Sequence, residues 1–422
     1  MNNKLFAVNQ TFYGQQELDT AWKKYSGIAP FREAGQTGSR IAVVMSDAAE
    51  LIALVLYLRE AGASVLLLHG ETPLETAKAL AQEAGCKGLV FHAAEGGYWP
   101  LAEQAYVTGE AASLCLFSSG TSGKPKLISR SWSSAAEEIA AYNEAIGLDA
   151  GVTPVVISPV SHAYGLIAGV LSAMERKAVP HIATYTNPKL TLALLRDTPN
   201  HIVYGVPLTL HVLTSLASGF RFNRLMSSGA PMPQGLLDNL TKLADRVLQQ
   251  YGCSEAGCIS INGYLQASGD IGRPLGHIRI LEAGTAHDSP KEIVIETGGS
   301  MIRTGDLGYM ESGELKLLAR VDDVINVAGL KVYPAEVENI ISALEGIREC
   351  VVYRGRHPVM GEIVCCMVAV DGKVTPDEVR AWCLAKLPPY KVPAKVECVD
   401  KLPRTATGKI SRKLLEEANL SQ

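Results

Sequence analysis

The first part of the chain alternates short apolar runs with longer segments of helical periodicity. Four apolar runs have the length of buried strands: residues 40–45, 64–69, 87–91 and 112–117. Two longer segments have apolar residues at helical spacing: residues 48–63, which close on Gly62, and residues 73–85. Strands that alternate with helices in this way predict a parallel sheet with helices packed on its faces.

A third helix is expected over residues 133–147. Ser134 and Glu137 have the spacing of a capping box, in which each side chain accepts a hydrogen bond from a backbone N–H of the other. Gly147 follows the periodic residues and is a typical helix terminator. We therefore expect Ser134 to cap the start of this helix and Gly147 to end it.

The chain changes character toward its C-terminus. Prolines and lysines become frequent there, and the tail "PRTATGKISRKLLEE" is basic. A charged break, "ARVDD", separates apolar segments and places a domain boundary between Arg320 and Val324. Because 422 residues exceed one ordinary core, we expect an N-terminal domain of residues 1–321 and a C-terminal domain of residues 322–422.

Composition and charge narrow the possibilities. With 47% hydrophobic and 19% charged residues, the chain has the composition of a packed globular protein. A net charge of -4 gives no basic field and argues against a nucleic-acid partner. The nine cysteines include no C-x-x-C pair, so we expect reduced thiols and neither a zinc site nor disulfides. No secretory signal or membrane-spanning run is visible, and we expect a cytoplasmic protein.

The stretch "FSSGTSGKPKLISRSW" (117–132) resembles a phosphate-binding loop, but not the Walker type. A Walker loop has a glycine where Ser118 stands and a hydroxyl residue after its lysine. Here Pro125 follows Lys124, and proline supplies neither an N–H nor a hydroxyl. Hydroxyls, turn glycines and positive charge suited to a phosphate chain come from Ser118, Ser119, Gly120, Thr121, Ser122, Gly123, Lys124 and Lys126. Taken alone, the loop is also compatible with a solvated turn.

Two further segments carry residues that suit a nucleotide. In "QQYGCSEAG", Tyr251 can stack on a base and Glu255 can bind Mg²⁺ beside phosphates. In "IRTGDLG", a Thr-Gly-Asp turn would present Asp306 to both ribose hydroxyls. The alternatives are an ordinary strand-to-turn segment and an Asx-type turn.

Two segments near the C-terminus add positive charge. "ARVDDVINVAGLKVYPAEVE" combines Arg320, paired aspartates, Gly329 and Lys331. "LPRTATGKISRK" places Lys409 directly after a glycine. Each segment also has an ordinary explanation, because lysine-rich tails are usually solvated.

In this order and spacing, the segments resemble the adenylate-forming enzyme superfamily, which includes acyl- and aryl-CoA synthetases, peptide-synthetase adenylation domains and luciferases. The motifs that carry the resemblance are the Ser/Thr/Gly-rich loop, Y-G-x-S/T-E, R-T-G-D, R-x-D-D…G-x-K and P-R-T-x-x-G-K. They extend from about residue 40 to residue 413. The resemblance implies an α/β fold, with a large N-terminal domain of parallel and mixed sheets flanked by helices and a small α+β C-terminal domain on a hinge.

The resemblance also implies an ATP-dependent acid–thiol ligase. A carboxylic acid would attack the α-phosphate of ATP, release pyrophosphate and form an acyl-adenylate. The thiol of a phosphopantetheine arm, on CoA or on a carrier protein, would then displace AMP. The implied cofactors are ATP and Mg²⁺, and neither a nucleic acid nor a membrane span is implied.

The implied roles fall on individual motif residues. Lys409 would bridge the α-phosphate and the acid, and Asp322 would be the hinge residue. The implied catalytic residues are Lys409, His162, Thr121 and Glu255, with Glu255 also as the Mg²⁺ ligand. Besides the phosphate loop, the residues implied to hold the nucleotide or the thiol arm are Gly229, Ala230, Tyr251, Gly252, Ser254, Asp306, Arg320, Gly329 and Lys331.

The segment "PVSHAYGL" matches the histidine-bearing segment of the family, near the acyl carboxylate. The implied acid pocket contains His162, Tyr164, Gly165, Tyr204 and Cys253. It would be lined by residues around 162–166, 203–206, 227–230 and 253–258. No charged residue stands out there to pair with an ammonium group. An α-amino acid is therefore disfavoured, and an aryl acid or a short-to-medium acyl acid is expected.

The chain departs from the family pattern at its periphery. It is shorter than typical members, it reaches the strand at Arg40 early, and the long loop expected before Met301 is nearly absent. Ala319 stands where the family has glycine. These losses leave the ATP motifs intact, so we expect an active enzyme of unknown oligomeric state.

Three hypotheses remain open. The thiol acceptor is either CoA or a carrier protein, as in stand-alone enzymes that load dihydroxybenzoate-like acids in siderophore or natural-product biosynthesis. CoA requires basic residues around its nucleotide, whereas a carrier protein requires a docking face. The third hypothesis is an ATP-binding protein without turnover, which would show no pyrophosphate exchange with any acid.

Overall fold

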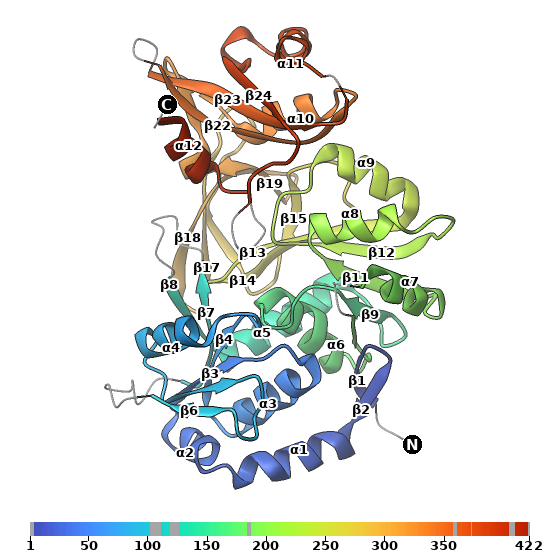
Figure 1. Cartoon of the computed structure of the whole chain (residues 1–422), viewed down its shortest axis with the longest axis vertical. Helices are drawn as coiled ribbons and strands as arrows, with labels where there is room; N and C mark the ends of the chain where they lie inside the picture. The colour runs from blue at the N-terminus through green and yellow to red at the C-terminus, as the bar shows by residue number, and fades with distance from the viewer. Residues whose placement is uncertain are drawn as a thin grey trace.

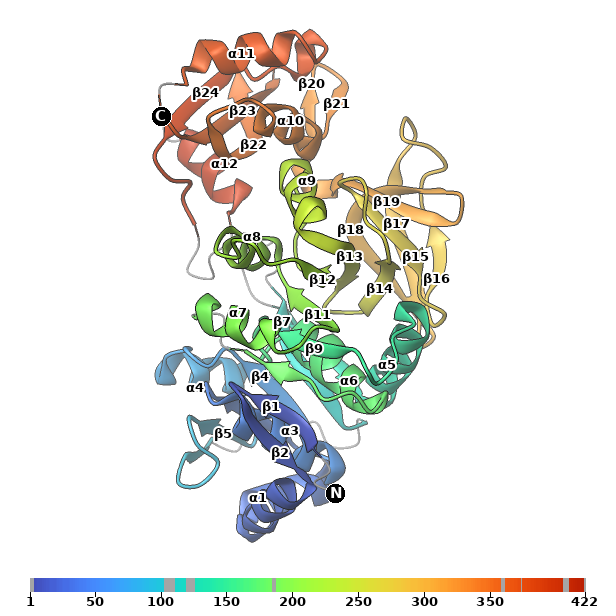
Figure 2. The same cartoon turned by 90° about the vertical axis from the view of Figure 1, so that its right-hand side faces the viewer.

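The computed structural model describes residues 4–101, 111–118, 126–183, 187–357, 361–372, 374–404 and 410–420. Three β-sheets and their helices form a large sheet-rich N-terminal domain and a smaller C-terminal domain (Figures 1 and 2). The expected α/β fold class is therefore confirmed. Within these residues, no helix is long and apolar enough to cross a membrane.

The first sheet has six strands in the order β6-β5-β3-β4-β7-β8. The strands are β3 Arg40–Val44, β4 Ser64–Leu68, β5 Gly88–Phe91, β6 Tyr98–Pro100, β7 Ser113–Ser118 and β8 Lys126–Ser131. The four strands from β5 to β7 are parallel, and β6 and β8 run antiparallel at the edges. Helix α3 (Ala48–Glu60) follows β3, and α4 (Leu74–Glu83) follows β4. The predicted strands and helices of this region are confirmed.

Residues before Arg40 form elements that the apolar pattern did not predict. Strands β1 (Lys4–Val8) and β2 (Thr11–Gly14) form a hairpin, and helices α1 (Gln15–Gly27) and α2 (Ala29–Thr37) follow. Phe6 and Phe31 in this segment have no exposed surface. The N-terminal segment is therefore part of the core and not a short lead to the first strand.

The second sheet has thirteen strands in the order β16-β17-β18-β19-β15-β14-β13-β12-β11-β9-β10-β1-β2. Besides β1 and β2, its strands are β9 Thr153–Val156, β10 His181–Ile182, β11 His201–Gly205, β12 Phe222–Ser227, β13 Ala244–Cys253, β14 Gly257–Asn262, β15 Asp270–Pro274, β16 Arg279–Glu282, β17 Lys291–Thr297, β18 Ser300–Glu311 and β19 Glu314–Arg320. Strands β13 to β1 along this order are parallel, whereas β14 to β19 pair antiparallel. The associated helices are α5 Trp132–Ile146, a π-helix at Tyr164–Leu171, α6 Ser172–Glu175, α7 Pro188–Arg196, α8 Pro207–Ser215 and α9 Gln234–Leu243.

Helix α5 begins earlier than expected. Its N-cap is Ser131, whose Oγ accepts a hydrogen bond from the backbone N–H of Ser134 at 3.1 Å. The predicted capping box on Ser134 and Glu137 is therefore wrong, because β8 ends at Ser131 and leads directly into the helix. Gly147 ends α5 in a left-handed conformation (φ 60°), as predicted.

The C-terminal domain is built on the third sheet, in the order β21-β20-β23-β22 with β24 beside β23. Its elements are a 3₁₀ turn at Val321–Asp323, β20 Ile325–Val327, β21 Leu330–Val332, α10 Pro334–Ser342, β22 Ile347–His357, β23 Gly361–Val370, α11 Pro376–Leu384, a 3₁₀ turn at Pro389–Lys391, β24 Lys395–Val399 and α12 Arg412–Leu420. This sheet and its helices lie at one end of the molecule, beyond β19 and α9 (Figures 1 and 2). The third sheet has an apolar core of its own, around Val352 and Cys366.

Candidate active site

The phosphate loop joins two paired strands. In the antiparallel pair β7–β8, Ser118 lies opposite Lys126. The residues between them lie outside the described part of the chain, namely Ser119, Gly120, Thr121, Ser122, Gly123 and Lys124. Ser118 is described as the last residue of β7, and Lys126 is exposed at the start of β8. Lys409 also lies outside the described residues. The roles of these residues stay predictions.

A buried carboxylate joins two of the predicted nucleotide residues. Tyr251 on β13 donates its hydroxyl proton to Asp306 Oδ2 at 2.6 Å, and Arg320 Nη1 donates to Asp306 Oδ1 at 3.0 Å. Asp306 is only 7% exposed. The structure thus brings Tyr251, Asp306 and Arg320 together, although 55 positions separate Tyr251 from Asp306.

The electrostatics of this cluster keep the tyrosine neutral. Burial and the neighbouring Asp306 raise the pKa of Tyr251 well above its usual value, so its hydroxyl stays a donor. Burial raises the pKa of Asp306, while the hydrogen bond from Tyr251 and the charge of Arg320 oppose the rise. The carboxylate is therefore held in one orientation by two donors.

Asp306 does not lie in a turn, as its Thr-Gly-Asp sequence had suggested. It lies within the long strand β18, opposite Arg320 on β19. Gly305 has φ 70°, and a Cβ at this position would lie 2.9 Å from Nη2 of Arg320. Glycine therefore lets the guanidinium approach the strand, and the predicted turn is wrong.

Glu255 lies at the tip of a hairpin. Strands β13 and β14 pair antiparallel up to Cys253 and Gly257, so Ser254 and Glu255 are in the connecting turn. Both side chains are partly exposed. At Gly252, a Cβ would lie 2.0 Å from the carbonyl oxygen of Gly257, so only glycine fits this close pair of strands. The tip is a well-defined place from which a carboxylate can reach a metal ion.

The residues predicted for the acid pocket differ in exposure. His162 is exposed, and its ring centroid lies 6.0 Å from that of His69, a residue just after β4. Tyr164 donates its hydroxyl proton to the carbonyl oxygen of Met226 at 2.8 Å. Tyr204 has no exposed surface and accepts a hydrogen bond from Tyr142 at 3.4 Å. Tyr204 therefore supports the neighbouring residues from within the core.

The structure explains the properties of two small residues of this region, Gly165 and Cys253. A Cβ at Gly165 would lie 2.4 Å from the carbonyl oxygen of Pro159, so glycine is required at the start of the π-helix. Burial raises the pKa of the Cys253 thiol to about 11. Cys253 is therefore a neutral thiol at physiological pH and not a nucleophile.

The remaining predicted residues lie at turns. Gly229 (φ 82°) and Ala230 are exposed after β12. Gly329 has φ 89° in the turn between β20 and β21, and its N–H donates to Asn326 Oδ1 at 2.9 Å. Lys331 is exposed on β21.

Asp322 lies in the 3₁₀ turn that connects β19 of the second sheet to β20 of the third. Its carbonyl oxygen accepts a hydrogen bond from Arg354. The carboxylate of its neighbour Asp323 accepts a hydrogen bond from Arg412 Nη1 at 2.9 Å. The C-terminal side of this turn is therefore fixed to β22 and α12.

Several residues of the site region were not predicted. His69 directly follows the parallel strand β4, and this position after a strand was the one signal that the sequence offered. Tyr142 lies inside the apolar pattern of α5, where nothing distinguishes it from a core residue. No sequence signal connects Arg130 with Glu138, although they form a buried ion pair.

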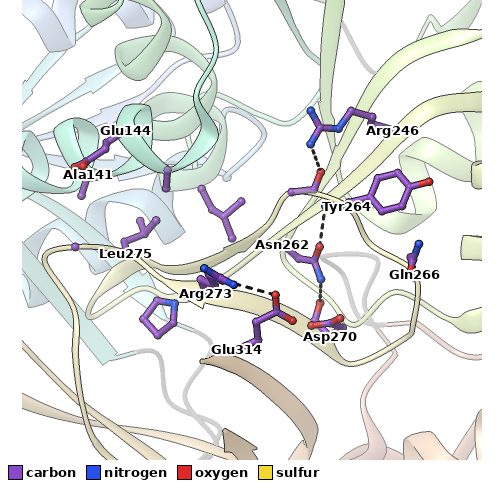
Figure 3. A pocket seen from close by; sticks show the side chains of 15 residues that line it. Ala141, Glu144, Arg246, Asn262, Tyr264, Gln266, Asp270, Arg273, Leu275 and Glu314 are labelled. Atoms are coloured by element: carbon purple, nitrogen blue, oxygen red, sulfur yellow. Dashed lines mark hydrogen bonds and ion pairs between the residues drawn. The ribbon is translucent and has the colours of Figure 1, made fainter. Parts of the chain in front are cut away.

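A cavity of about 670 Å³ opens elsewhere, between the C-terminal end of α5 and strands β13 to β15 (Figure 3). Its charged and aromatic lining residues include Glu144, Arg246, Tyr264, Arg273 and Glu314. Arg246 donates to the carbonyl oxygen of Gly263 at 3.0 Å, and Arg273 lies 3.8 Å from Glu314. None of the residues predicted for the active site lines this cavity.

Comparison with known proteins places these features in a family. The model of the family described as AMP-binding enzyme matches residues 92–303, and that of the AMP-binding enzyme C-terminal domain matches residues 336–409. A 3,4-dihydroxybenzoate–[aryl-carrier protein] ligase of Bacillus anthracis is 44% identical over 413 residues, which cover 98% of both chains. A 2-succinylbenzoate–CoA ligase of Bacillus velezensis is 25% identical, with 98% of this chain and 93% of that protein covered.

The crystal structure of ATP-bound MatB from Rhodopseudomonas palustris has the same fold. It superimposes with a TM-score of 0.85 at 20% sequence identity and covers 99% of both chains. The matched family models span both domains, and the 44% identical relative covers nearly the whole chain. The chain therefore belongs to the AMP-binding, adenylate-forming enzyme family and is an AMP-forming acid–thiol ligase.

Proposed function

We propose that this enzyme uses ATP and Mg²⁺ to adenylate an aryl acid and then transfers the aroyl group to the phosphopantetheine thiol of a carrier protein. The observation that carries the proposal is the Tyr251–Asp306–Arg320 cluster next to the hairpin tip of Glu255. The choice of acid and acceptor is supported by the 44% identity to a 3,4-dihydroxybenzoate–[aryl-carrier protein] ligase.

The chemistry requires two displacements. A carboxylate oxygen attacks the α-phosphorus of ATP, the bond to the β-phosphate oxygen breaks, and pyrophosphate leaves. The thiolate of the acceptor then attacks the acyl carbon, and AMP leaves with the electron pair of the broken C–O bond. Both steps bring anions together, so fixed positive groups and donors lower the barrier, typically by about 3–4 kcal/mol for each well-placed donor.

The predicted residues have distinct roles in this proposal. Asp306 accepts hydrogen bonds from the ribose hydroxyls, while Arg320 holds its carboxylate. Tyr251 lies against the adenine, and Gly229, Ala230, Gly252 and Ser254 supply backbone or hydroxyl contacts to the nucleotide. The loop of residues 118–126, including Thr121, holds the β- and γ-phosphates, and Lys409 bridges the α-phosphate and the acid.

The residues around Glu255 fit a Mg²⁺ ion that arrives with ATP. Among the described residues, no group of three or more His, Cys, Asp or Glu side chains could hold a metal ion. Mg²⁺ at nucleotide sites typically needs only one or two carboxylates, because phosphates and water supply its other ligands. Glu255, partly exposed at a fixed turn, meets this need. When bound, the ion neutralises charge on the leaving pyrophosphate.

The acid pocket is best suited to a neutral ring. Burial raises the pKa values of Tyr164 and Tyr204, so both remain uncharged. Apart from Glu255, the predicted lining segments contain no acidic residue that could pair with an ammonium group. We propose His162 and Gly165 at the carboxylate end of the acid, Cys253 along its side, and Tyr204 as support. A short-to-medium acyl acid is the alternative substrate.

We propose that residues 322–422 turn as a unit about Asp322 between the two steps. Gly329 and Lys331 then line the path of the pantetheine arm. This motion is supported by the position of the 3₁₀ turn and by the long hydrogen bond, 3.4 Å, between Gln234 on α9 and Asn339 on α10. Hinges of this kind are common gating devices in enzymes. The nine free cysteines are consistent with a reducing, cytoplasmic location.

A panel of acids tests the proposal. Acid-dependent exchange of pyrophosphate into ATP is measured with hydroxylated benzoates, aliphatic acids and amino acids. We expect exchange with aryl acids, strongest with dihydroxybenzoates. Exchange with amino acids alone would overturn the pocket assignment. Loss of exchange with every acid would favour an ATP-binding protein without turnover.

The acceptor is tested in a second assay. Thioester formation is compared between CoA and a phosphopantetheinylated aryl-carrier domain at equal concentration. We expect a higher kcat/KM with the carrier domain. A higher kcat/KM with CoA would establish the second candidate, an aryl-CoA ligase, which is favoured by the similarity to 2-succinylbenzoate–CoA ligases.

A further inference from the structure

A buried ion pair joins β8 to α5 beneath the hairpin tip. Arg130 Nη2 lies 2.7 Å from Glu138 Oε2, and the two side chains are 7% and 5% exposed. The other carboxylate oxygen of Glu138 accepts a hydrogen bond from the backbone N–H of Cys258 at 2.7 Å. Glu138 therefore binds two partners that come from different elements, β8 and β14.

The pair packs directly against the backbone of the hairpin. Gly257 is the first residue of β14 and has φ 75°. A Cβ at this position would lie 2.3 Å from both Arg130 Nη1 and Glu138 Oε2. Only glycine leaves room for the pair, and Gly257 is two residues from Glu255. The contact therefore fixes the base of the turn that carries Glu255.

The same pair includes a residue of the strand that follows the phosphate loop in the sequence. Arg130 lies on β8, the strand that begins at Lys126 directly after the loop. One ion pair thus links the strand that follows the loop to the hairpin tip with the proposed Mg²⁺ ligand. We infer that Arg130 and Glu138 are positioning residues that hold the turn of Glu255 in place against β8 for Mg²⁺-dependent ATP binding.

This inference rests on the proposed function, because it requires Glu255 to bind Mg²⁺. Stability alone is a poor explanation for the pair. Removing two charges from water is costly, and well-packed neutral residues often replace a buried ion pair without loss of stability. Arg130 Nε, Nη1 and Nη2 and Glu138 Oε2 make no hydrogen bond among the described residues, so the two side chains are joined by charge and not by a directed hydrogen bond. What the pair supplies is position, because Glu138 holds the backbone N–H of Cys258 and the charge of Arg130 lies directly beside Glu138.

The test compares ATP binding with and without the metal in the full-length protein. Calorimetry gives the Kd of ATP in excess Mg²⁺ and again in EDTA. The variant Glu138→Gln keeps an oxygen for the N–H of Cys258 but removes the charge that Arg130 pairs with. We expect its affinity for Mg²⁺·ATP to fall about tenfold or more, as for other residues that orient a metal ligand. Its affinity for ATP in EDTA should stay close to that of the wild type.

A double variant separates positioning from stability. Arg130→Met/Glu138→Gln leaves no uncompensated charge, so its melting temperature should return toward that of the wild type. The loss of Mg²⁺-dependent affinity should persist in it. If Glu138→Gln does not fold, the double variant alone decides. Asp270→Asn is the matched control, because Asp270 pairs with Lys316 at 2.8 Å with side chains 17% and 18% exposed, away from the hairpin tip. We expect it to change stability without changing the effect of Mg²⁺.

Three outcomes overturn the inference. In the first, the double variant recovers metal-dependent binding together with its melting temperature. In the second, affinities with Mg²⁺ and with EDTA fall equally. In the third, the variants bind Mg²⁺·ATP as the wild type does. A wild-type protein that binds ATP equally with and without Mg²⁺ would be a different failure, since it would remove Glu255 from the proposed function and the positioning role with it.

Discussion

The hydroxyl of Tyr251 controls when Asp306 is charged, and Tyr251→Phe tests this control. The variant keeps the ring that we place against adenine and removes only the donor to Asp306 Oδ2, 2.6 Å away. Hydrogen bonds to charged groups contribute about 1.5–3 kcal/mol. If nucleotide binding depends on this oriented carboxylate, KM for ATP should rise by roughly ten- to a hundredfold.

The pH dependence of KM for ATP is a more specific test than the size of its increase in Tyr251→Phe. Burial raises the pKa of Asp306, and the hydrogen bond from Tyr251 is the first of the contributions that lower it again. In the proposed function the carboxylate form of Asp306 accepts hydrogen bonds from ribose, and this form is lost as pH falls through the raised pKa. Without the Tyr251 hydroxyl the pKa rises further, so the loss of ATP affinity on acidification should begin at a higher pH.

The assay is pyrophosphate exchange at saturating acid, with KM for ATP measured from mildly acidic to neutral pH. Wild type, Tyr251→Phe and Asp306→Asn are compared. Asp306→Asn should bind ATP weakly at every pH. Its affinity should not fall further on acidification, because an amide does not titrate in this range. The reasoning is refuted if Tyr251→Phe loses affinity for ATP at the same pH as the wild type, or at a lower pH.

Three further predictions concern other parts of the molecule. Lys409→Ala should abolish acid-dependent exchange yet still form thioester from preformed acyl-adenylate; undiminished exchange would remove Lys409 from its role. Arg412→Met should lower the free energy of unfolding, measured in urea, by about 2–3 kcal/mol, because Arg412 donates to Asp323 at 2.9 Å and to both oxygens of Glu338 at 2.7 and 3.0 Å. Iodoacetamide should label the partly exposed Cys253 slowly at neutral pH and faster as pH rises toward its pKa of about 11; rapid labelling at pH 7 would contradict this raised pKa.

The parallel sheet was predictable because local pattern and tertiary environment agree there. Strand β4 is buried at all five positions, and every residue after Ser64 is apolar, as expected for a strand that is covered on both faces. Helix α5 shows where local pattern fails. Ser131 and Ser134 are both good N-caps, and the pairing of β8 with β7, which ends at Ser131, decides between them.

The predicted site residues were identified by motif, and their arrangement required the fold. Thr-Gly-Asp is a common turn sequence, yet Asp306 lies in β18 because it pairs with Arg320 on β19, at a bulge in the pairing of β18 with β17. Tyr251 lies on β13 and Asp306 on β18, and β14, β15 and β19 separate these two strands in the sheet. Their side chains meet only because the sheet curves strongly between them. Glu138 gave no signal, since a charged residue in an amphipathic helix usually faces solvent, and neither did Arg130 on β8, since arginine is mostly exposed. Only the packing of α5 on β14 shows that this carboxylate is buried.

The ion pairs on either side of the 3₁₀ turn restrict where the two domains can rotate. Arg320 is held to Asp306 at 3.0 Å on the N-terminal side, and Asp323 is held to Arg412 at 2.9 Å on the C-terminal side. Between these anchors lie only Val321 and Asp322. A rotation that preserves both ion pairs is therefore concentrated in the backbone dihedrals between Arg320 and Asp323, and we propose the domain boundary there. Asp322→Pro, which fixes one of these dihedrals, should arrest the thiol-transfer step while exchange continues, whereas equal loss of both steps would place the pivot elsewhere.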